Sequence, residues 1–216
     1  ILGKMFRYLA SQTKTNICCH VDHGYTLDEC YEGIDSGFTS VMFDGSKLTL
    51  KENIKISKKI ASRAHKYNIS VEGEIGFVGY DNGKISEGTN IEDAVTFANK
   101  SNIDAMAISV GNTHLQTSKK ASIDFNKINL IEAKTKIPLV LHGSSGIPVE
   151  QRKKLARKTK VAKLNIGTEI RMTFGEALRK NLKNNPKTYD RLQLLKPTIK
   201  DLTKVTKKII KQIGPN

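Results

Sequence analysis

The sequence predicts an α/β protein built on a parallel sheet, and three observations support this fold class. Six short apolar runs recur along the 216 residues, and segments with helical spacing separate them. No hairpin turn signal joins one run directly to the next, so consecutive strands are expected to be parallel and connected by right-handed helical crossovers. Each run ends in polar, acidic or glycine-rich residues, and this is where parallel α/β folds keep their chemistry.

The predicted strands and helices alternate along the chain. The strands are expected over Ile17–Asp22, Ser40–Asp44, Ser70–Ile75, Ala105–Val110, Pro138–His142 and Val161–Ile166. The helices are expected over residues 1–13, Leu27–Ser36, Leu50–Tyr67, Ile91–Asn99, Leu130–Lys134, Val149–Arg157 and Glu169–Leu182, and again after Pro197. A glycine-rich loop that ends near Gly88 follows the third strand.

Length and composition indicate one soluble domain. A chain with 38% hydrophobic and 26% charged residues can bury a single sizeable core at this length. It has no run of 18 apolar residues and its start lacks the parts of a signal peptide, so we expect neither a membrane span nor secretion. Three crowded cysteines, Cys18, Cys19 and Cys30, are typical of free thiols in a reducing compartment, which predicts a cytoplasmic location.

The net charge of +15 arises near the C-terminus. Residues 151–216 hold 19 Lys and Arg against 4 Asp and Glu, whereas residues 1–150 hold 17 of each. A basic tail can indicate nucleic acid or an anionic membrane as partner. Here the lysines alternate with Leu202, Val205 and Ile209, which is the pattern of an amphipathic helix packed on a core. We therefore expect a basic helical part from about residue 183, and neither nucleic acid nor membrane as partner.

Three histidines stand at the ends of three different predicted strands. His23 follows the first strand within the stretch HVDHG, His114 follows the fourth, and His142 ends the fifth. If the strands close into a barrel, these ends converge on one face. Three converging imidazoles that leave one coordination position open form a zinc-type site. Any one of these residues alone would more often be a structural or surface histidine, so the hypothesis rests on all three together.

Acidic residues lie beside these histidines. Asp22 precedes His23, and a carboxylate next to a metal site can act as a general acid or base, or can orient an imidazole. Glu72 and Glu74 share one face of the third strand by the two-residue period, so one or both could face a cation. Their alternative role is to pair with lysines of the interior or with loop amides.

Two glycine-rich loops after the last two strands are candidate phosphate sites. They read HGSSG over residues 142–146 and NIGTE over residues 165–169. Glycines let backbone N–H groups approach an anion, hydroxyls add donors, and Thr168 immediately precedes a helix N-terminus whose dipole favours phosphate. Phosphate sites after the last strands are a recurrent feature of barrels.

From about Asn16 to Leu182 the chain resembles the class II, zinc-dependent fructose-bisphosphate aldolases, in the branch that includes tagatose-bisphosphate aldolases. The resemblance rests on six stretches in the family's order and spacing: HVDHG, residues 37–54, VEGEIGFVG, residues 104–114, IPLVLHGSSGIP and AKLNIGTE. It implies a (β/α)8 TIM barrel whose first two strand–helix units are missing from this chain. It also implies that residues 1–216 form a single barrel domain.

The resemblance implies a role for each candidate site residue. His23, His114 and His142 would bind catalytic zinc, and Asp22 would be the proton donor or acceptor. Glu74 matches a position linked to an alternative buried metal site, and a monovalent cation would also suit the family. The phosphate of dihydroxyacetone phosphate would be held by Gly143, Ser144, Ser145, Asn165, Ile166, Gly167 and Thr168. Zinc would polarise the ketone, so no Schiff-base lysine is needed.

Two positions depart from the family pattern. Leu115 stands where glycine is usual, and its side chain is expected to crowd the approach of the backbone to the substrate phosphate. Asn82 falls where a mobile-loop glutamate is expected, and the adjacent Asp81 is the candidate replacement.

Three functions remain open at this point. The leading one is a zinc aldolase that cleaves fructose 1,6-bisphosphate into dihydroxyacetone phosphate and glyceraldehyde 3-phosphate. The first alternative is an aldolase for tagatose bisphosphate or another phosphorylated ketose. The second is a catalytically degenerate aldolase homologue that acts as a binding protein. The resemblance alone also implies a homodimer or homotetramer.

Overall fold

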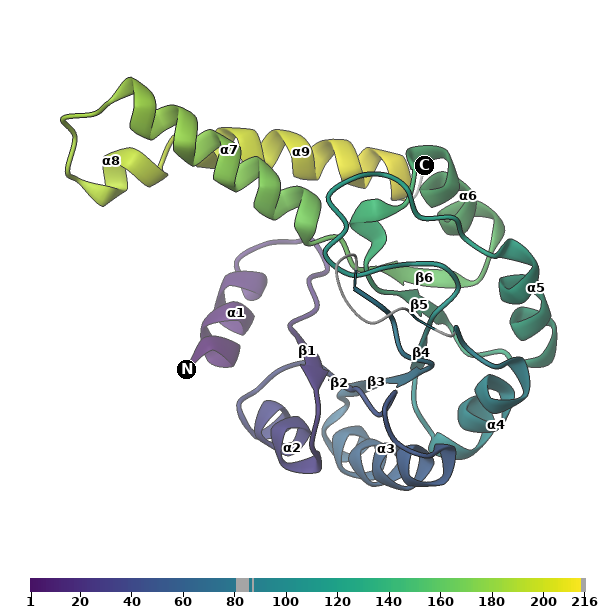
Figure 1. Ribbon diagram of the computed structural model, residues 1–216. Helices are drawn as coiled ribbons and strands as arrows, with labels where there is room; N and C mark the ends of the chain where they lie inside the picture. The colour runs from purple at the N-terminus through teal and green to yellow at the C-terminus, as the bar shows by residue number, and fades with distance from the viewer. Residues whose placement is uncertain (81–85, 87, 215–216) are drawn as a thin grey trace.

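A computed structural model of the chain describes residues 1–80, 86 and 88–214 (Figure 1). Within this part, six parallel strands form one sheet in chain order, and each strand pairs with the next. The strands are β1 (His20–Gly24), β2 (Ser40–Phe43), β3 (Ser70–Ile75), β4 (Ala105–Ile108), β5 (Leu139–Leu141) and β6 (Val161–Leu164). The sheet is curled into a half-barrel, with helices along its outer face (Figure 1). The predicted parallel α/β class is confirmed, and a closed eight-stranded barrel is not seen in the described residues.

One helix precedes the first strand, further helices fall between the strands as the sequence predicts, and helices continue beyond the last strand. They are α1 (Leu2–Ser11), α2 (Leu27–Asp35), α3 (Leu50–Ala64), α4 (Ile91–Ser101), α5 (Phe125–Lys134), α6 (Val149–Lys158), α7 (Thr168–Asn184), α8 (Arg191–Leu195) and α9 (Thr198–Ile213). Short 3-10 turns lie at η1 (His65–Tyr67) and η2 (Ser144–Gly146).

Polar caps fix where several helices begin. Thr26 and Thr49 each accept a hydrogen bond from a backbone N–H in the first turn of α2 and α3, and a glutamate side chain completes a capping box in both. Asp124 caps α5 in the same way through its side chain. Because of this cap, α5 begins at Phe125, five residues before the predicted start at Leu130.

Strand alternation divides the side chains between two faces. Val41 and Phe43 of β2 join the large apolar core between sheet and helices, and Val71 and Ile75 of β3 do the same. The opposite face has only a small apolar cluster among the described residues, made of Met42, Ala107 and Val140. The inner face of the half-barrel therefore has room for polar chemistry.

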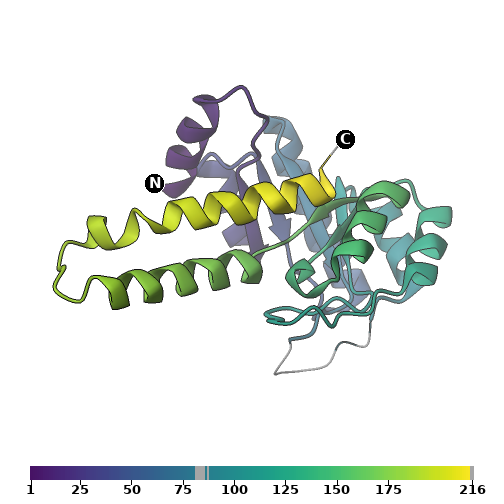
Figure 2. The same cartoon turned by 90° about the horizontal axis from the view of Figure 1, so that it is seen from above.

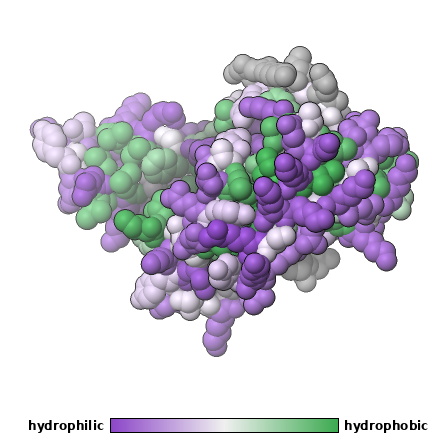
Figure 3. All heavy atoms as spheres, turned by 90° about the horizontal axis from the view of Figure 1, so that it is seen from below, coloured by the Kyte–Doolittle hydropathy of each residue, from purple (hydrophilic) through white to green (hydrophobic). Residues whose placement is uncertain are grey.

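An arm formed by α7, α8 and α9 projects away from the sheet (Figures 1 and 2). Ile209 of α9 is buried, and Leu202 and Val205 are half-buried, so the predicted amphipathic pattern of the basic helix is confirmed. α7 has no fully buried residue, and hydrophobic side chains are visible on the projecting part of the molecule (Figure 3). Among the described residues, no helix combines the length and apolarity that a membrane span requires.

Candidate active site at the inner mouth of the half-barrel

The three predicted histidines lie together on the inner side of the sheet. The ring centroids of His23 and His142 are 4.6 Å apart, those of His23 and His114 are 5.4 Å apart, and those of His114 and His142 are 5.8 Å apart. One ring nitrogen from each residue lies within 4.8 Å of the other two. Three neutral imidazoles at this spacing form a donor set that suits a borderline-soft divalent cation such as zinc.

A backbone feature lets Asp22 and His23 reach the same site. Neighbouring strand residues normally point to opposite faces. His23 has a φ of +59°, in the left-handed region, and the register of β1 against β2 shifts between Val21 and Gly24. This irregularity breaks the alternation, so both side chains reach the site.

Two of the histidines contact a carboxylate through one ring nitrogen. Nδ1 of His23 lies 3.0 Å from Oδ2 of Asp44, and Nε2 of His142 lies 2.8 Å from Oε1 of Glu72. A carboxylate accepts, so the contacted nitrogen carries the proton and the other nitrogen keeps its lone pair. His114 is held differently, because its backbone N–H donates to the carbonyl of Gly79 and its ring stacks on Tyr80.

The electrostatic environment favours an uncharged His114 and a charged Glu72. Burial, together with the nearby His142 and His23, lowers the pKa of His114 to about 4. Burial alone would raise the pKa of Glu72, but the hydrogen bond from His142 and the charge of Lys163 outweigh it and lower that pKa to about 2. The site therefore offers His114 as a neutral ligand near pH 7.

Glu74 adds a second group of cation-binding type. Its Oε2 is buried, lies 3.8 Å from Nδ1 of His23 and has no hydrogen-bond partner among the described residues. Burial and then the charge of Asp44 raise the pKa of Glu74 well above its usual value. His23, Asp44 and Glu74 offer ligand atoms within 4.8 Å of one another.

Asp22 is linked to the opposite edge of the sheet. Nδ2 of Asn165 donates to Oδ1 of Asp22 at 3.1 Å and lies 3.1 Å from Nδ1 of His142. Asp22 itself is exposed. The amide therefore joins the predicted acid–base residue to the predicted ligand group.

The two glycine-rich loops lie against each other. The N–H of Ser144 donates to the carbonyl of Asn165 at 3.0 Å, and Thr168 begins α7. Gly143 has a φ of +63°, and a Cβ there would lie 2.3 Å from the carbonyl oxygen of Thr113, so the close approach requires glycine. Ile166 and Gly167 lie between Asn165 and the start of α7 at Thr168.

The serine hydroxyls of this loop are partly used by the fold. Ser144 Oγ donates to the carbonyl of Leu141, whereas Ser145 Oγ accepts from the N–H of Glu169 and keeps its own proton. In this arrangement the Ser144 hydroxyl proton is used within the fold, whereas the Ser145 hydroxyl proton is available to a ligand. Backbone N–H groups and the dipole of α7 remain the other features suited to an anion.

Sequence reasoning assigned no role to Arg152, which is fully buried. Its guanidinium donates to the carbonyls of Ser145 and Ile147 and to Oε2 of Glu169. This residue therefore fastens the HGSSG loop to the start of α7. No local sequence signal distinguishes Arg152 from its neighbours, because it lies in a run of lysines and arginines that is typical of a solvent-exposed helix face.

The two departures from the family pattern have different outcomes. Leu115 has a φ of +57° and a side chain that is 54% exposed, so it occupies a backbone conformation that glycine adopts more easily. Leu115 therefore carries backbone strain, and the crowding expected of its side chain stays a prediction. Asn82 and Asp81 lie outside the described residues.

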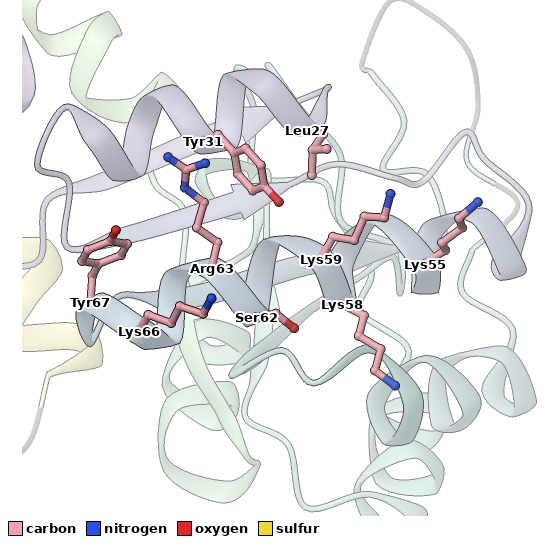
Figure 4. Close-up of a pocket in the computed structure, with 9 residues that line it drawn as sticks. All are labelled: Leu27, Tyr31, Lys55, Lys58, Lys59, Ser62, Arg63, Lys66 and Tyr67. Atoms are coloured by element: carbon pink, nitrogen blue, oxygen red, sulfur yellow. The ribbon is translucent and has the colours of Figure 1, made fainter.

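Another cavity lies on the outer surface between α2 and α3, with a volume of about 920 Å³ (Figure 4). Four lysines and Arg63 line it, and its lining includes no histidine or carboxylate. Arg63 is paired with Asp35 at 2.7 Å and stacks over Tyr31. This groove therefore lacks the imidazoles and carboxylates that lie together in the histidine cluster.

Comparisons with known proteins agree on one family. A family model described as fructose-bisphosphate aldolase class-II matches residues 1–216. The 6-phospho-5-dehydro-2-deoxy-D-gluconate aldolase of Shouchella clausii is 37% identical over 201 residues, which cover 92% of this chain and 68% of that protein. The fructose-bisphosphate aldolase of Staphylococcus aureus is 34% identical over 202 residues, which cover 92% of this chain and 70% of that protein.

Solved structures show the same arrangement. The YdjI aldolase from Escherichia coli K12 matches with a TM-score of 0.81 at 26% identity, over 99% of this chain and 74% of that one. A putative fructose-1,6-bisphosphate aldolase from Coccidioides immitis has a TM-score of 0.83 at 20% identity, over 98% and 76% of the two chains. The second likeness shows the fold alone.

Proposed function

Because this chain belongs to the class II fructose-bisphosphate aldolase family, whose members are lyases, we propose that it is a metal-dependent aldolase for a phosphorylated ketose. Fructose 1,6-bisphosphate is the first proposed substrate. The observation that carries the proposal is the group of His23, His114 and His142, whose ring nitrogens lie within 4.8 Å of one another beside Asp22.

The proposed metal ligands are the three histidines, and zinc is the proposed ion. The low pKa of His114 and the carboxylate contacts of His23 and His142 suit neutral nitrogen ligands. A bound zinc ion supplies positive charge that polarises the substrate carbonyl and stabilises the negative charge left when the C3–C4 bond breaks.

Asp22 is the proposed general base for cleavage. Its carboxylate takes the proton from the C4 hydroxyl while the C3–C4 bond breaks and C4 becomes an aldehyde. The amide of Asn165 donates a hydrogen bond of 3.1 Å to Oδ1 of Asp22 and so orients this carboxylate. In the reverse, condensing direction, the same group returns the proton.

The proposed phosphate site comprises Gly143, Ser144, Ser145, Asn165, Ile166, Gly167 and Thr168. It is supported by the contact between the two loops, by the positive φ of Gly143 and by the N-terminus of α7 beside them. Backbone N–H groups and the helix dipole would bind the phosphate next to the ketone.

A second candidate substrate is 6-phospho-5-dehydro-2-deoxy-D-gluconate, which the name of the Shouchella clausii relative favours. Both compounds have a phosphate on the carbon next to the ketone, and cleavage of either releases dihydroxyacetone phosphate. They differ in the other half of the molecule, which carries a phosphate in fructose 1,6-bisphosphate and a carboxylate in the gluconate compound. The two loops and the three histidines would therefore act in the same way on both.

The experiment is a cleavage assay of the purified chain with both substrates and with tagatose 1,6-bisphosphate. Dihydroxyacetone phosphate is measured before chelation, after chelation and after zinc is restored. Activity that is lost on chelation and regained with zinc supports the proposal, and the preferred substrate identifies the ketose. A folded, zinc-loaded protein that cleaves none of the three contradicts it and favours the degenerate binding protein.

We also propose that residues 1–216 form a single domain in which the curled sheet is part of a (β/α)8 barrel, and that the protein is cytoplasmic.

A homo-oligomer is proposed because the arm exposes several large apolar side chains. These are Met172, Phe174, Leu182, Leu192, Leu195 and Ile199. Light scattering after size-exclusion chromatography tests this, and a Leu182→Glu variant of smaller mass would support it.

A further inference from the structure

One buried carboxylate of the inner face, that of Glu72, contacts side chains from other parts of the sheet. Glu72 of β3 is 3% exposed, and its Oε1 lies 2.8 Å from Nε2 of the fully buried His142. Its Oε2 lies 2.8 Å from Nζ of Lys163 on β6. Nε2 of His20 lies 3.6 Å from the same Oε2, with no hydrogen bond. Glu72 therefore accepts from the imidazole through one oxygen and from the ammonium through the other.

The second ring nitrogen of His142 gives independent evidence about its proton. Nδ1 lies 3.1 Å from Nδ2 of Asn165, and an amide NH2 group can only donate. Nδ1 is therefore an acceptor, which agrees with a proton on Nε2 that is donated to Glu72. Contacts on both sides of the ring select the same tautomer.

We propose that Glu72, held by Lys163, is a positioning residue that fixes His142 in the Nε2–H tautomer. Nδ1 then stays unprotonated, the form in which it can bind the metal in place of its contact with Asn165. This inference rests on the proposed metal site and adds two residues that contact neither substrate nor metal. Lys163 fixes the orientation of Glu72, because the ammonium occupies Oε2 and leaves Oε1 for the imidazole. The buried carboxylate also has its charge compensated by this lysine.

A Glu72→Gln substitution tests the proposal without changing the volume of the side chain. The single oxygen of the amide would be attracted to the Lys163 ammonium, so its NH2 group would face Nε2 of His142. An imidazole nitrogen that faces a donor must accept, which places the proton on Nδ1 and blocks the ligand position. We expect zinc affinity to fall about 10- to 100-fold, the range that loss of such an orienting partner causes.

The direct measurement is the ¹⁵N spectrum of the His142 ring in metal-free protein, alongside competitive zinc titration. In the unsubstituted chain Nδ1 is expected to be unprotonated, and in Glu72→Gln it is expected to carry the proton. In the double variant Glu72→Gln with Lys163→Met, no ammonium competes for the amide oxygen. The oxygen can then accept from Nε2–H, and part of the tautomer and of the zinc affinity should return. Glu150→Gln, an exposed position on α6, is the matched control.

Three results would overturn the inference: a protonated Nδ1 in the unsubstituted chain, an unchanged tautomer in Glu72→Gln, or a loss of zinc affinity without a change of tautomer. The circular-dichroism melting curve of each variant verifies that it is folded. The ring spectrum needs neither metal nor substrate, so it separates this inference from the proposed function. A correct tautomer in a protein that cleaves no ketose leaves the positioning role standing and contradicts the aldolase activity.

Discussion

The amide of Asn165 donates a hydrogen bond of 3.1 Å to Asp22, and these two residues come from opposite edges of the curled sheet. Asp22 lies on β1 and Asn165 directly follows β6. The exposed carboxylate thus has one oxygen oriented by the amide. This relationship supports the assignment of Asp22 as the acid–base group.

An Asp22→Ala variant should retain zinc binding and lose most of its cleavage activity. Removal of a positioned general base typically lowers the rate by about 10²- to 10⁴-fold. The measurement is kcat for fructose 1,6-bisphosphate together with the zinc content of the purified variant. Asp28→Ala, an exposed aspartate at the start of α2, is the control and should keep its activity. Wild-type turnover in Asp22→Ala would refute the acid–base role.

Leu115→Gly should not destabilise the protein, although it removes a large side chain. A left-handed backbone costs an L-residue about 1–2 kcal/mol, and the substitution removes this strain. The gain roughly offsets or exceeds the entropic cost of introducing glycine, which is about 0.5–1 kcal/mol. The control is Leu130→Gly, because Leu130 is 50% exposed, as Leu115 is 54% exposed, but lies within α5. Urea unfolding should show a loss of about 1 kcal/mol only for the control. Equal losses in the two variants would mean that Leu115 is not strained.

The metal-free protein should lose stability as the pH falls from 6.5 to about 4. Burial is the largest cause that lowers the pKa of both His20 and His114 to about 4, against 6.5 in an unfolded chain. Between these values the unfolded chain binds a proton that the folded chain does not, so acid favours unfolding. The stability that depends on uncharged His20 and His114 is fully present above pH 6.5. Urea titrations at several pH values measure the slope, and His20→Gln should reduce it. A slope unaffected by that change would show that His20 does not contribute.

Zinc should raise the thermal stability of the wild-type chain, and a His114→Ala variant should lose this response. A ligand at 100 times its dissociation constant stabilises the folded state by about 2.7 kcal/mol. Differential scanning fluorimetry with and without zinc measures the shift. His65→Ala is the control, since His65 contacts Asp104 outside the histidine cluster. A zinc response that survives in His114→Ala would exclude that residue from the ligand set.

Much of this fold is visible in the sequence because local signals agree with it. The apolar runs predict all six strands to within a few residues, and Thr26 and Thr49 mark two helix starts. Strand-end positions alone point to His23, His114 and His142, since parallel strands bring these ends together.

The rest depends on relationships between distant residues. The left-handed conformation of His23, which breaks strand alternation, has no local signal in HVDHG. Asp44 stands at a predicted strand end, but its contact with His23 depends on the pairing of β1 with β2. Arg152 appears in sequence as one more basic residue of a helix, and only tertiary packing shows that it is buried.

The contact between the two edges of the sheet has a consequence for how the protein acquires activity during folding. The site needs residues from the first strand and from the segment after the last strand, so no early folding intermediate that lacks either one can contain it. Contacts between such distant parts of the chain form slowly, because loop-closure entropy opposes them. In refolding experiments, helical structure should therefore return before zinc affinity does. During synthesis, the contact between Asp22 and Asn165 would form only after β6 and the segment that follows it have emerged from the ribosome.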